Sequence, residues 1–133
     1  MDNVRKFPLC TVLTVTTGRL LTKRKSTNDN GISDLHEILE HMIGETPFTH
    51  TLGSFADKCK PWLLFWFPEL DSNELWSEVE KLSWLLSGFS KNTNKYVKDA
   101  VVVKWLNSLV AKGICSEKYD IGQIGEHIES KNP

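Results

Sequence analysis

The chain has 133 residues, 40% of them hydrophobic and 25% charged, and its formal net charge is −1. This length and composition are typical of one soluble globular domain, with no room for a second hydrophobic core. The near-zero net charge excludes a global electric field that would attract nucleic acid or an anionic membrane.

The sequence also favours the cytoplasm over the membrane or the cell exterior. The longest apolar run, Trp62 to Phe67, has six residues, whereas a membrane-spanning helix needs about 20. The first residues have no apolar core behind a basic start, so we expect no signal peptide. The cysteines, Cys10, Cys59 and Cys115, are odd in number and form no Cys-x-x-Cys pair. They are therefore expected to be reduced thiols of a cytoplasmic protein.

Two segments near the chain ends have the character of strands. Residues 9–21 are dominated by Thr and Val and alternate in part, which predicts a β-strand. The following segment, 22–31, is polar, basic and rich in turn-forming residues, and is expected to be a surface loop. Near the C-terminus, Tyr119 and Ile121 alternate with Asp120. This alternation predicts a short last strand that pairs with the N-terminal one, since a lone strand has no partner.

The middle of the chain has the apolar spacing of amphipathic helices. Leu35, Ile38, Leu39 and Met42 form one stripe, and Gly44 follows as a helix stop. The fold class that follows is α+β, a helix-rich single domain with a small antiparallel sheet formed by N-terminal and C-terminal strands. The other predicted helical segments, each bounded by Pro, Gly or polar residues, are 52–60, which Pro61 would stop, 61–67, about 72–89 and about 95–112.

The run "HEILEH" within the first of these helices looks like a zinc-protease motif. Such a motif needs two histidines four residues apart on one helix face. His36 and His41 are five apart, which rotates them by about 140° around a helix. The pairs that share a face are His36 with Glu40 and Glu37 with His41, which are solvated acid–imidazole pairs. The sequence therefore predicts no metal site.

A third histidine, His50, lies in the turn "GETPFTHTLG" between two predicted helices, where functional residues are often displayed. Its imidazole has three readings: a general base, a helix cap or a solvated turn residue. The chain has no Gly-x-Ser-x-Gly elbow and no glycine-rich phosphate loop. We therefore predict no catalytic residue and no cofactor, and a hydrolase-like enzyme that uses His50 is the minority alternative.

The aromatic content indicates a binding surface. In "PWLLFWFPEL", which holds Trp62 and Trp66, nearly every position is apolar, so a helix there would be apolar on all sides. Trp76 and Trp84 lie off the stripe of their own predicted helix. These tryptophans either fill the core or form an interface, where Trp is over-represented among the residues that dominate binding. Their surplus favours a homo-oligomer or a protein partner.

Nucleic-acid binding is a competing interpretation. The segments 22–25, "TKRK", and 91–98, "KNTNKYVK", are basic, and Tyr96 offers a ring for base stacking. Acidic residues elsewhere cancel this charge, and no helix-turn-helix or RNA-binding signature is present. A small nucleic-acid-binding regulatory protein that uses these basic loops is thus possible in principle but not favoured.

Three stretches resemble one family: "TVLTVTTGRLLT", "LHEILEHMIGETPFTHTLG" and "CKPWLLFWFPEL". They are similar to small phage- and prophage-encoded proteins that carry a domain of unassigned function, through their Thr-Gly-Arg-Leu-Leu, Glu-Ile-Leu, Phe-Thr-His and Cys-x-Pro-x-Leu-Leu elements. The resemblance spans about residues 11–70. After it come a helical part, about 71–113, and a short strand with its tail, 114–133. His36 stands where the family usually has Tyr, and Thr51 replaces Gln. The resemblance implies a biological setting and no reaction.

Within that setting, Arg19 and His50 are the best polar candidates, because they lie at a predicted strand end and a turn between helices. Arg19 either pairs with a carboxylate such as Glu37 or a helix C-terminus, or it contacts a partner; His50 either bonds backbone or contacts a partner. The function expected is that of a non-enzymatic phage or prophage accessory protein. It would bind a protein in the host cell cytoplasm, and an inhibitor of host defence such as an anti-CRISPR is one concrete form.

Overall fold

The computed structural model describes residues 4–18, 21, 32–90, 92 and 94–124. Helices predominate, and a pair of short strands joins the two ends of the chain. The elements are, in chain order, β1 (Arg5–Pro8), α1 (Leu9–Thr17), α2 (Ser33–Ile43), η1 (Thr49–Thr51), α3 (Leu52–Trp66), η2 (Pro68–Asp71), α4 (Asn73–Ser87), α5 (Lys95–Ala111) and β2 (Lys118–Ile121), where η denotes a short 3-10 helix.

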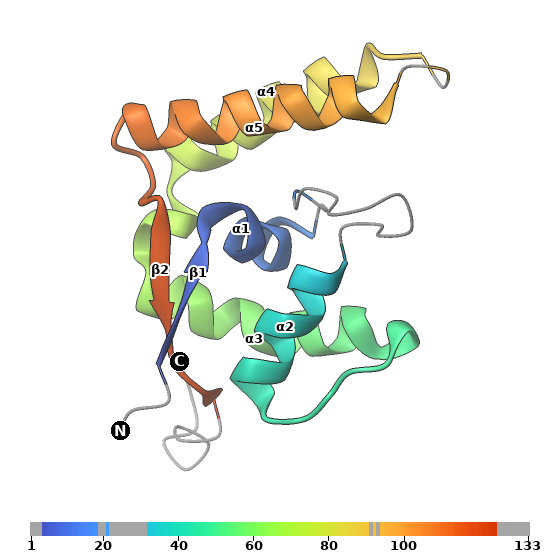
Figure 1. Ribbon diagram of the computed structural model, residues 1–133. Helices are drawn as coiled ribbons and strands as arrows, with labels where there is room; N and C mark the ends of the chain where they lie inside the picture. The colour runs from blue at the N-terminus through green and yellow to red at the C-terminus, as the bar shows by residue number, and fades with distance from the viewer. Residues whose placement is uncertain (1–3, 19–20, 22–31, 91, 93, 125–133) are drawn as a thin grey trace.

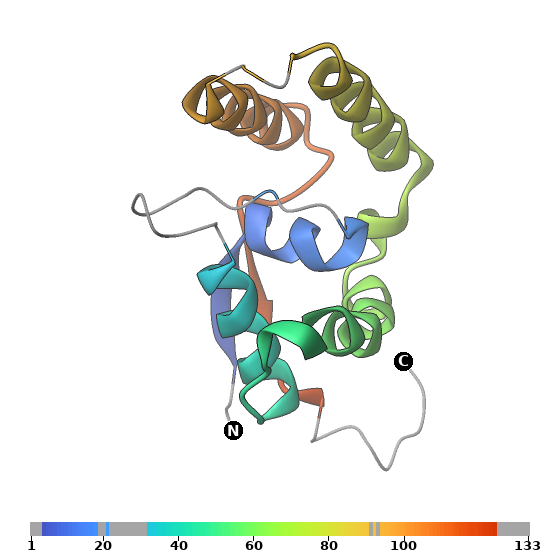
Figure 2. The same cartoon turned by 90° about the vertical axis from the view of Figure 1, so that its right-hand side faces the viewer.

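The helix α1 lies at the centre of the molecule. The helices α4 and α5 lie side by side on one side of it, and α2 and α3 lie on the other (Figures 1 and 2). Every residue from Thr11 to Thr16 is buried, and the side chains of Val12 and Leu13 are fully enclosed. One hydrophobic core therefore surrounds α1 and includes residues from all the longer helices and both strands.

The predicted strand over residues 9–21 is wrong, because residues 9–17 form α1 and the N-terminal strand is the shorter β1. Thr and Val have low intrinsic helix propensity, but burial on nearly all sides overrides that preference. The partial alternation of residues 11–16 has no structural meaning, since all of them are buried. The predicted class, helix-rich α+β with an antiparallel sheet of N-terminal and C-terminal strands, is confirmed.

The threonine hydroxyls of α1 are bonded inside the core. Thr14 Oγ1 donates to the carbonyl oxygen of Cys10 at 2.7 Å and accepts from the backbone N–H of Leu21 at 3.0 Å. Thr17 Oγ1 donates to the Leu13 carbonyl at 2.6 Å. Buried polar groups need such partners, because an unpaired hydroxyl or amide in the core costs about 1–3 kcal/mol. The structure has no unsatisfied buried side-chain polar atom among the residues that it describes.

The strands β1 and β2 pair antiparallel, with Phe7 opposite Tyr119 and Arg5 opposite Ile121. The predicted last strand around Tyr119 is thus confirmed, and Phe7, Tyr119 and Ile121 are buried in the core. His41 attaches α2 to this ribbon, because its Nε2 donates to the Ile121 carbonyl oxygen at 2.7 Å. The second histidine of "HEILEH" therefore has a structural hydrogen bond to β2.

The helix α3 continues through Pro61, so the prediction that Pro61 would divide this region into two segments is wrong. Proline lacks the N–H that would bond the carbonyl of Asp57, four residues earlier. Asp57 and Pro61 are both exposed, so water can reach the free carbonyl. The predicted helices that begin near residues 33, 72 and 95 are confirmed, with Gly44 and Gly113 in the left-handed conformation after two of them.

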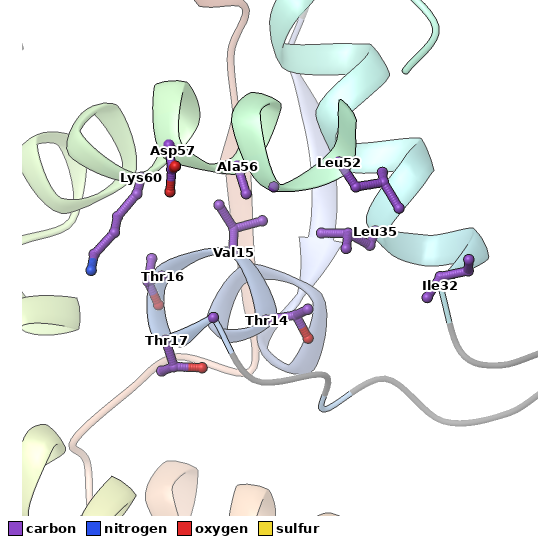
Figure 3. A pocket seen from close by; sticks show the side chains of 12 residues that line it. Thr14, Val15, Thr16, Thr17, Ile32, Leu35, Leu52, Ala56, Asp57 and Lys60 are labelled. Atoms are coloured by element: carbon purple, nitrogen blue, oxygen red, sulfur yellow. The ribbon is translucent and has the colours of Figure 1, made fainter. Parts of the chain in front are cut away.

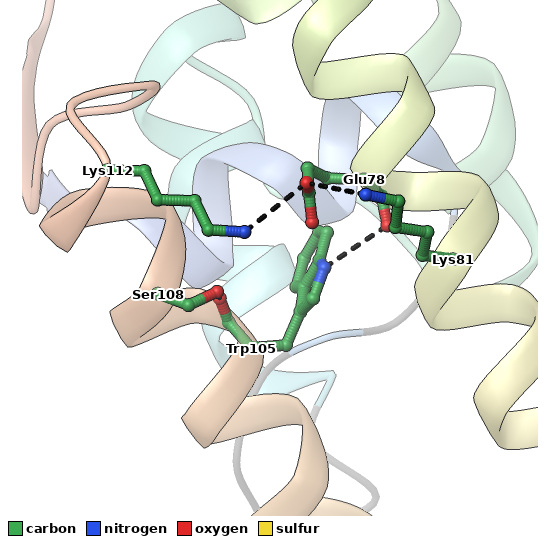
Figure 4. A network of polar contacts seen from close by, with 5 residues as sticks. All are labelled: Glu78, Lys81, Trp105, Ser108 and Lys112. Atoms are coloured by element: carbon green, nitrogen blue, oxygen red, sulfur yellow. Dashed lines mark hydrogen bonds and ion pairs between the residues drawn. The ribbon is translucent and has the colours of Figure 1, made fainter.

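A partly buried polar network joins α4 to α5 (Figure 4). The indole N–H of Trp105 donates to the Glu78 carbonyl oxygen at 3.1 Å. The Glu78 carboxylate accepts from Lys81 at 3.3 Å and from Lys112 at 3.4 Å. Burial alone would raise the pKa of Glu78, but the hydrogen bonds and charges of the two lysines hold this pKa below its ordinary value.

No helix within the described ranges combines the length and apolar character that crossing a membrane requires.

The bonding of α1 predicts a difference between two threonines of the same helix. Thr14→Val keeps the side-chain shape but leaves the Leu21 amide without its acceptor, so it should lower the free energy of unfolding by about 1–3 kcal/mol. Thr16→Val is the matched control. Among the described residues, its hydroxyl makes one long bond of 3.4 Å, to the Leu13 carbonyl that Thr17 also bonds, so the loss should be below about 1 kcal/mol. Urea unfolding measures both, and equal losses would contradict the assigned role of Thr14.

The lowered pKa of Glu78 predicts a loss of stability in acid. The folded protein binds the Glu78 proton less readily than the unfolded chain does, so the stabilisation is complete above the ordinary value of 4.5 and is lost as the pH falls below it. At neutral pH, wild type should therefore have a larger free energy of unfolding than Glu78→Gln. This difference should shrink as the pH falls into the acid range. A difference that stays constant down to about pH 3 would contradict the role of the charge.

Candidate functional site

The turn between α2 and α3, residues 44–51, is fixed by hydrogen bonds at its start. Gly44 has φ 87°, a left-handed conformation that glycine adopts without strain, and its N–H donates to the Glu40 carbonyl at 2.8 Å. The Thr46 hydroxyl donates to the Glu40 carboxylate. Pro47 is buried, and its ring fixes its own φ angle and restricts the backbone of Thr46 before it. The chain therefore enters the second half of the turn in a defined direction.

Thr51 fixes the second half of the turn. Its hydroxyl oxygen accepts from the Phe48 N–H and donates to the Phe48 carbonyl, both at 2.9 Å, and its own N–H reaches the same carbonyl at 2.9 Å. Three short bonds between two residues three positions apart leave the intervening backbone little freedom. The turn presents its side chains from a rigid frame.

That frame displays two stacked rings. Phe48 is 67% exposed, and His50 is also exposed. Their ring centroids are 5.7 Å apart with an interplanar angle of 9°, so the rings are nearly parallel. The pair combines an apolar surface with the polar nitrogens of an imidazole, which suits recognition of another molecule.

A pocket of about 330 Å³ begins where this turn enters α3 (Figure 3). Val15 from α1, Leu35 from α2 and Leu52 from α3 give it apolar walls. Asp57 and Lys60 of α3 add one charge of each sign, and the Lys60 ammonium also lies 5.8 Å from the Trp76 ring centroid. Such a site suits a small apolar group that carries a polar end.

The four tryptophans singled out in the sequence do not converge on this turn. Trp62 is buried and lies 5.9 Å from the half-buried Trp66, ring to ring. Trp76 is half-buried and donates its indole N–H to Asp71 at 2.9 Å. Trp84 is 80% exposed, on the side of α4 away from the core. The tryptophans thus divide between core packing and one exposed position.

Some of the residues predicted to bind a partner or nucleic acid lie outside the described part of the chain. Arg19 and the basic segment 22–25 lie outside the described residues, as do positions 91 and 93 of the segment 91–98. The sequence reasoning, for its part, missed Phe48 as a displayed side chain. The available signal was its place directly after Pro47 and two residues before His50.

The three cysteine thiols are poor candidates for a catalytic nucleophile. Burial raises the pKa of Cys59 to about 12, despite the nearby charge of Lys58, and raises that of Cys115 to about 11. Burial also raises the pKa of Cys10. A thiol attacks as the thiolate, so these three are protonated and unreactive at neutral pH. Among the described residues, His, Cys, Asp and Glu form no group of three or more that could hold a metal ion.

A family model described as a domain of unknown function, DUF7736, matches residues 7–73. The match includes α1, α2, α3 and the displayed turn, and it ends at the first residue of α4. No match was found among curated proteins or among solved structures.

Proposed function

This chain belongs to the family of the domain of unknown function DUF7736, and on that premise we propose that it acts by binding another protein and not by catalysis. The observation that carries the proposal is the stacked pair of Phe48 and His50 on a rigid turn. An exposed aromatic ring leaves apolar surface in water, which burial against a partner removes at about 25 cal/mol per Å².

The rigidity of the turn favours affinity. Binding is weakened by the entropy lost when mobile side chains and loops become ordered. The bonds between Phe48 and Thr51 fix the backbone of the turn before any partner arrives. A few well-placed residues, often aromatic, usually supply most of the binding free energy of an interface. Phe48 and His50 are such residues in this proposal.

The setting that we propose is a phage or prophage, with the protein acting in the host cytoplasm as an accessory factor. Support comes from the resemblance of three stretches to small phage- and prophage-encoded proteins. Inhibition of a host defence system, as by an anti-CRISPR, is the concrete form of the proposal. A nucleic-acid target is less well supported at this turn, because Glu45 lies within it, Glu40 precedes it and Asp57 follows it, and these carboxylates repel phosphate.

Phe48→Ala and His50→Ala test the proposal directly. Both residues are exposed, so each variant should unfold within about 0.5 kcal/mol of wild type. Phe65→Ala, on a side chain of α3 that is 60% exposed, is the matched control. Tagged proteins would be used to capture partners from lysate of a bacterial host, and quantitative mass spectrometry would compare what each variant retains. The turn variants should retain at least about tenfold less partner than wild type and the control, a loss of about 1.4 kcal/mol.

A second measurement links binding to the proposed setting. A host with an active defence system would express each variant, and the plating efficiency of a phage sensitive to that system would be measured. Wild type and Phe65→Ala should raise plating, and Phe48→Ala should not. Turn variants that keep both capture and protection would contradict the proposal, and a His50→Ala protein that unfolds would assign His50 to the fold.

A further inference from the structure

The strand β2 pairs with β1 along one edge, and no described strand occupies its other edge (Figure 1). In an antiparallel pair, residues that exchange both backbone hydrogen bonds alternate with residues whose N–H and C=O groups point away from the partner strand. The Leu9 N–H donates to the Glu117 carbonyl oxygen at 2.9 Å, so these two residues form a bonded pair that continues the register of the ribbon. The next bonded pair along the ribbon is therefore Phe7 with Tyr119.

The free edge of β2 carries backbone groups without a partner. Between the bonded pairs, Asp120 lies opposite Lys6. Lys118 lies opposite Pro8, which has no N–H and suits a position without a bond between the strands. The N–H and C=O groups of Lys118 and Asp120 therefore point away from β1, and no other described residue bonds them. Such an edge is a template for a further extended strand.

We propose that this further strand is β2 of a second copy of the chain. The two copies would pair antiparallel across a two-fold axis that passes through the sheet at Tyr119. Lys118 of each copy then lies opposite Asp120 of the other, and each such pair exchanges two backbone hydrogen bonds. The two ribbons become one antiparallel sheet in the order β1-β2-β2-β1, which is closer to the usual size of a sheet than an isolated pair of strands.

The side chains of β2 are complementary in this register. Lys118 and Asp120 are exposed and share one face of the ribbon, while Tyr119 between them is buried on the other face. Residues directly opposite each other in antiparallel strands have their side chains on the same face. The Lys118 ammonium of each copy therefore meets the Asp120 carboxylate of the other. Asp120 also pairs with Lys6 of its own chain at 3.1 Å, and a carboxylate has acceptor sites for both ammonium groups.

The charges also exclude the neighbouring two-fold registers. An axis at Lys118 places this lysine against its own copy, and an axis at Asp120 does the same for the aspartate, so both are repulsive. The contact is short, because β2 has four residues. We therefore expect a reversible dimer with a dissociation constant of about 100 μM. The contact uses neither Phe48 nor His50, so the inference does not rest on the proposed function.

Amide hydrogen exchange, measured by NMR at two protein concentrations, tests the pairing residue by residue. The Tyr119 amide bonds β1 and should be protected at both concentrations. The amides of Lys118 and Asp120 should exchange freely at about 10 μM, where the chain is mostly monomeric. At about 1 mM they should exchange about fourfold more slowly, because most chains are then paired. Equal exchange of these two amides at both concentrations would overturn the proposal.

Charge exchange tests the register, with sedimentation velocity as the readout. Lys118→Glu turns both attractions between the copies into repulsions, so it should weaken the dimer at least about tenfold. The double variant Lys6→Glu/Asp120→Lys should do the same, and it keeps an ion pair of reversed polarity within each ribbon. Lys104→Glu, at an exposed position of α5, makes the same charge change as Lys118→Glu and is the control that should dimerise as wild type does.

An equal mixture of Lys118→Glu and Lys6→Glu/Asp120→Lys should form a heterodimer, because each facing pair is then opposite in charge. All of these variants should melt as folded proteins, since the changed side chains are exposed. A wild type that stays monomeric up to about 1 mM, or a mixture that does not associate, would overturn the proposal. Single proteins that dimerise as tightly as wild type would overturn it as well.

Discussion

The structure depends on a helix of Thr and Val that has no solvent-exposed face along most of its length. Residues 11–16 of α1 are all buried, so each hydroxyl in that span has to be bonded within the protein. Thr14 meets this requirement by bonding both its own helix and the amide of Leu21. This arrangement stabilises the helix and fixes the chain that follows it. The remaining elements pack around α1 and bury it.

The packing around α1 places two different surfaces on opposite parts of the molecule. The helices α2 and α3 pack against α1 on one side, and the turn that joins them carries Phe48 and His50 (Figure 1). The pair α4 and α5 covers the other side and exposes Trp84. The first surface lies within the family match and the second beyond it. The stacked ring pair on the turn and the exposed Trp84 therefore lie on separate parts of the chain.

Much of this fold follows from sequence pattern, and the exceptions have physical causes. The stripe from Leu35 to Met42 identified α2 because one face of that helix is buried and the other is not. The same reasoning failed for α1, since a helix buried on all sides has no such stripe and its β-branched residues indicate a strand. At the candidate site, the turn position predicts that His50 is displayed, and the structure shows it exposed. The exposure of Phe48 was not predicted, because an apolar residue is expected to be buried unless tertiary packing leaves it outside the core. The position of Trp84 off the apolar stripe of α4 indicated that its side chain does not point into the core of the protein.

Native-state hydrogen exchange of α1 tests the account most directly. If α1 is the buried centre, the amides of Leu13 to Thr17, which bond within the helix, should exchange only when the whole protein unfolds. Their exchange free energies should then equal the free energy of unfolding measured with denaturant. Exchange of these amides at the rates of surface turns, while the amides of α3 stay protected, would show that α1 is not the element on which the fold depends.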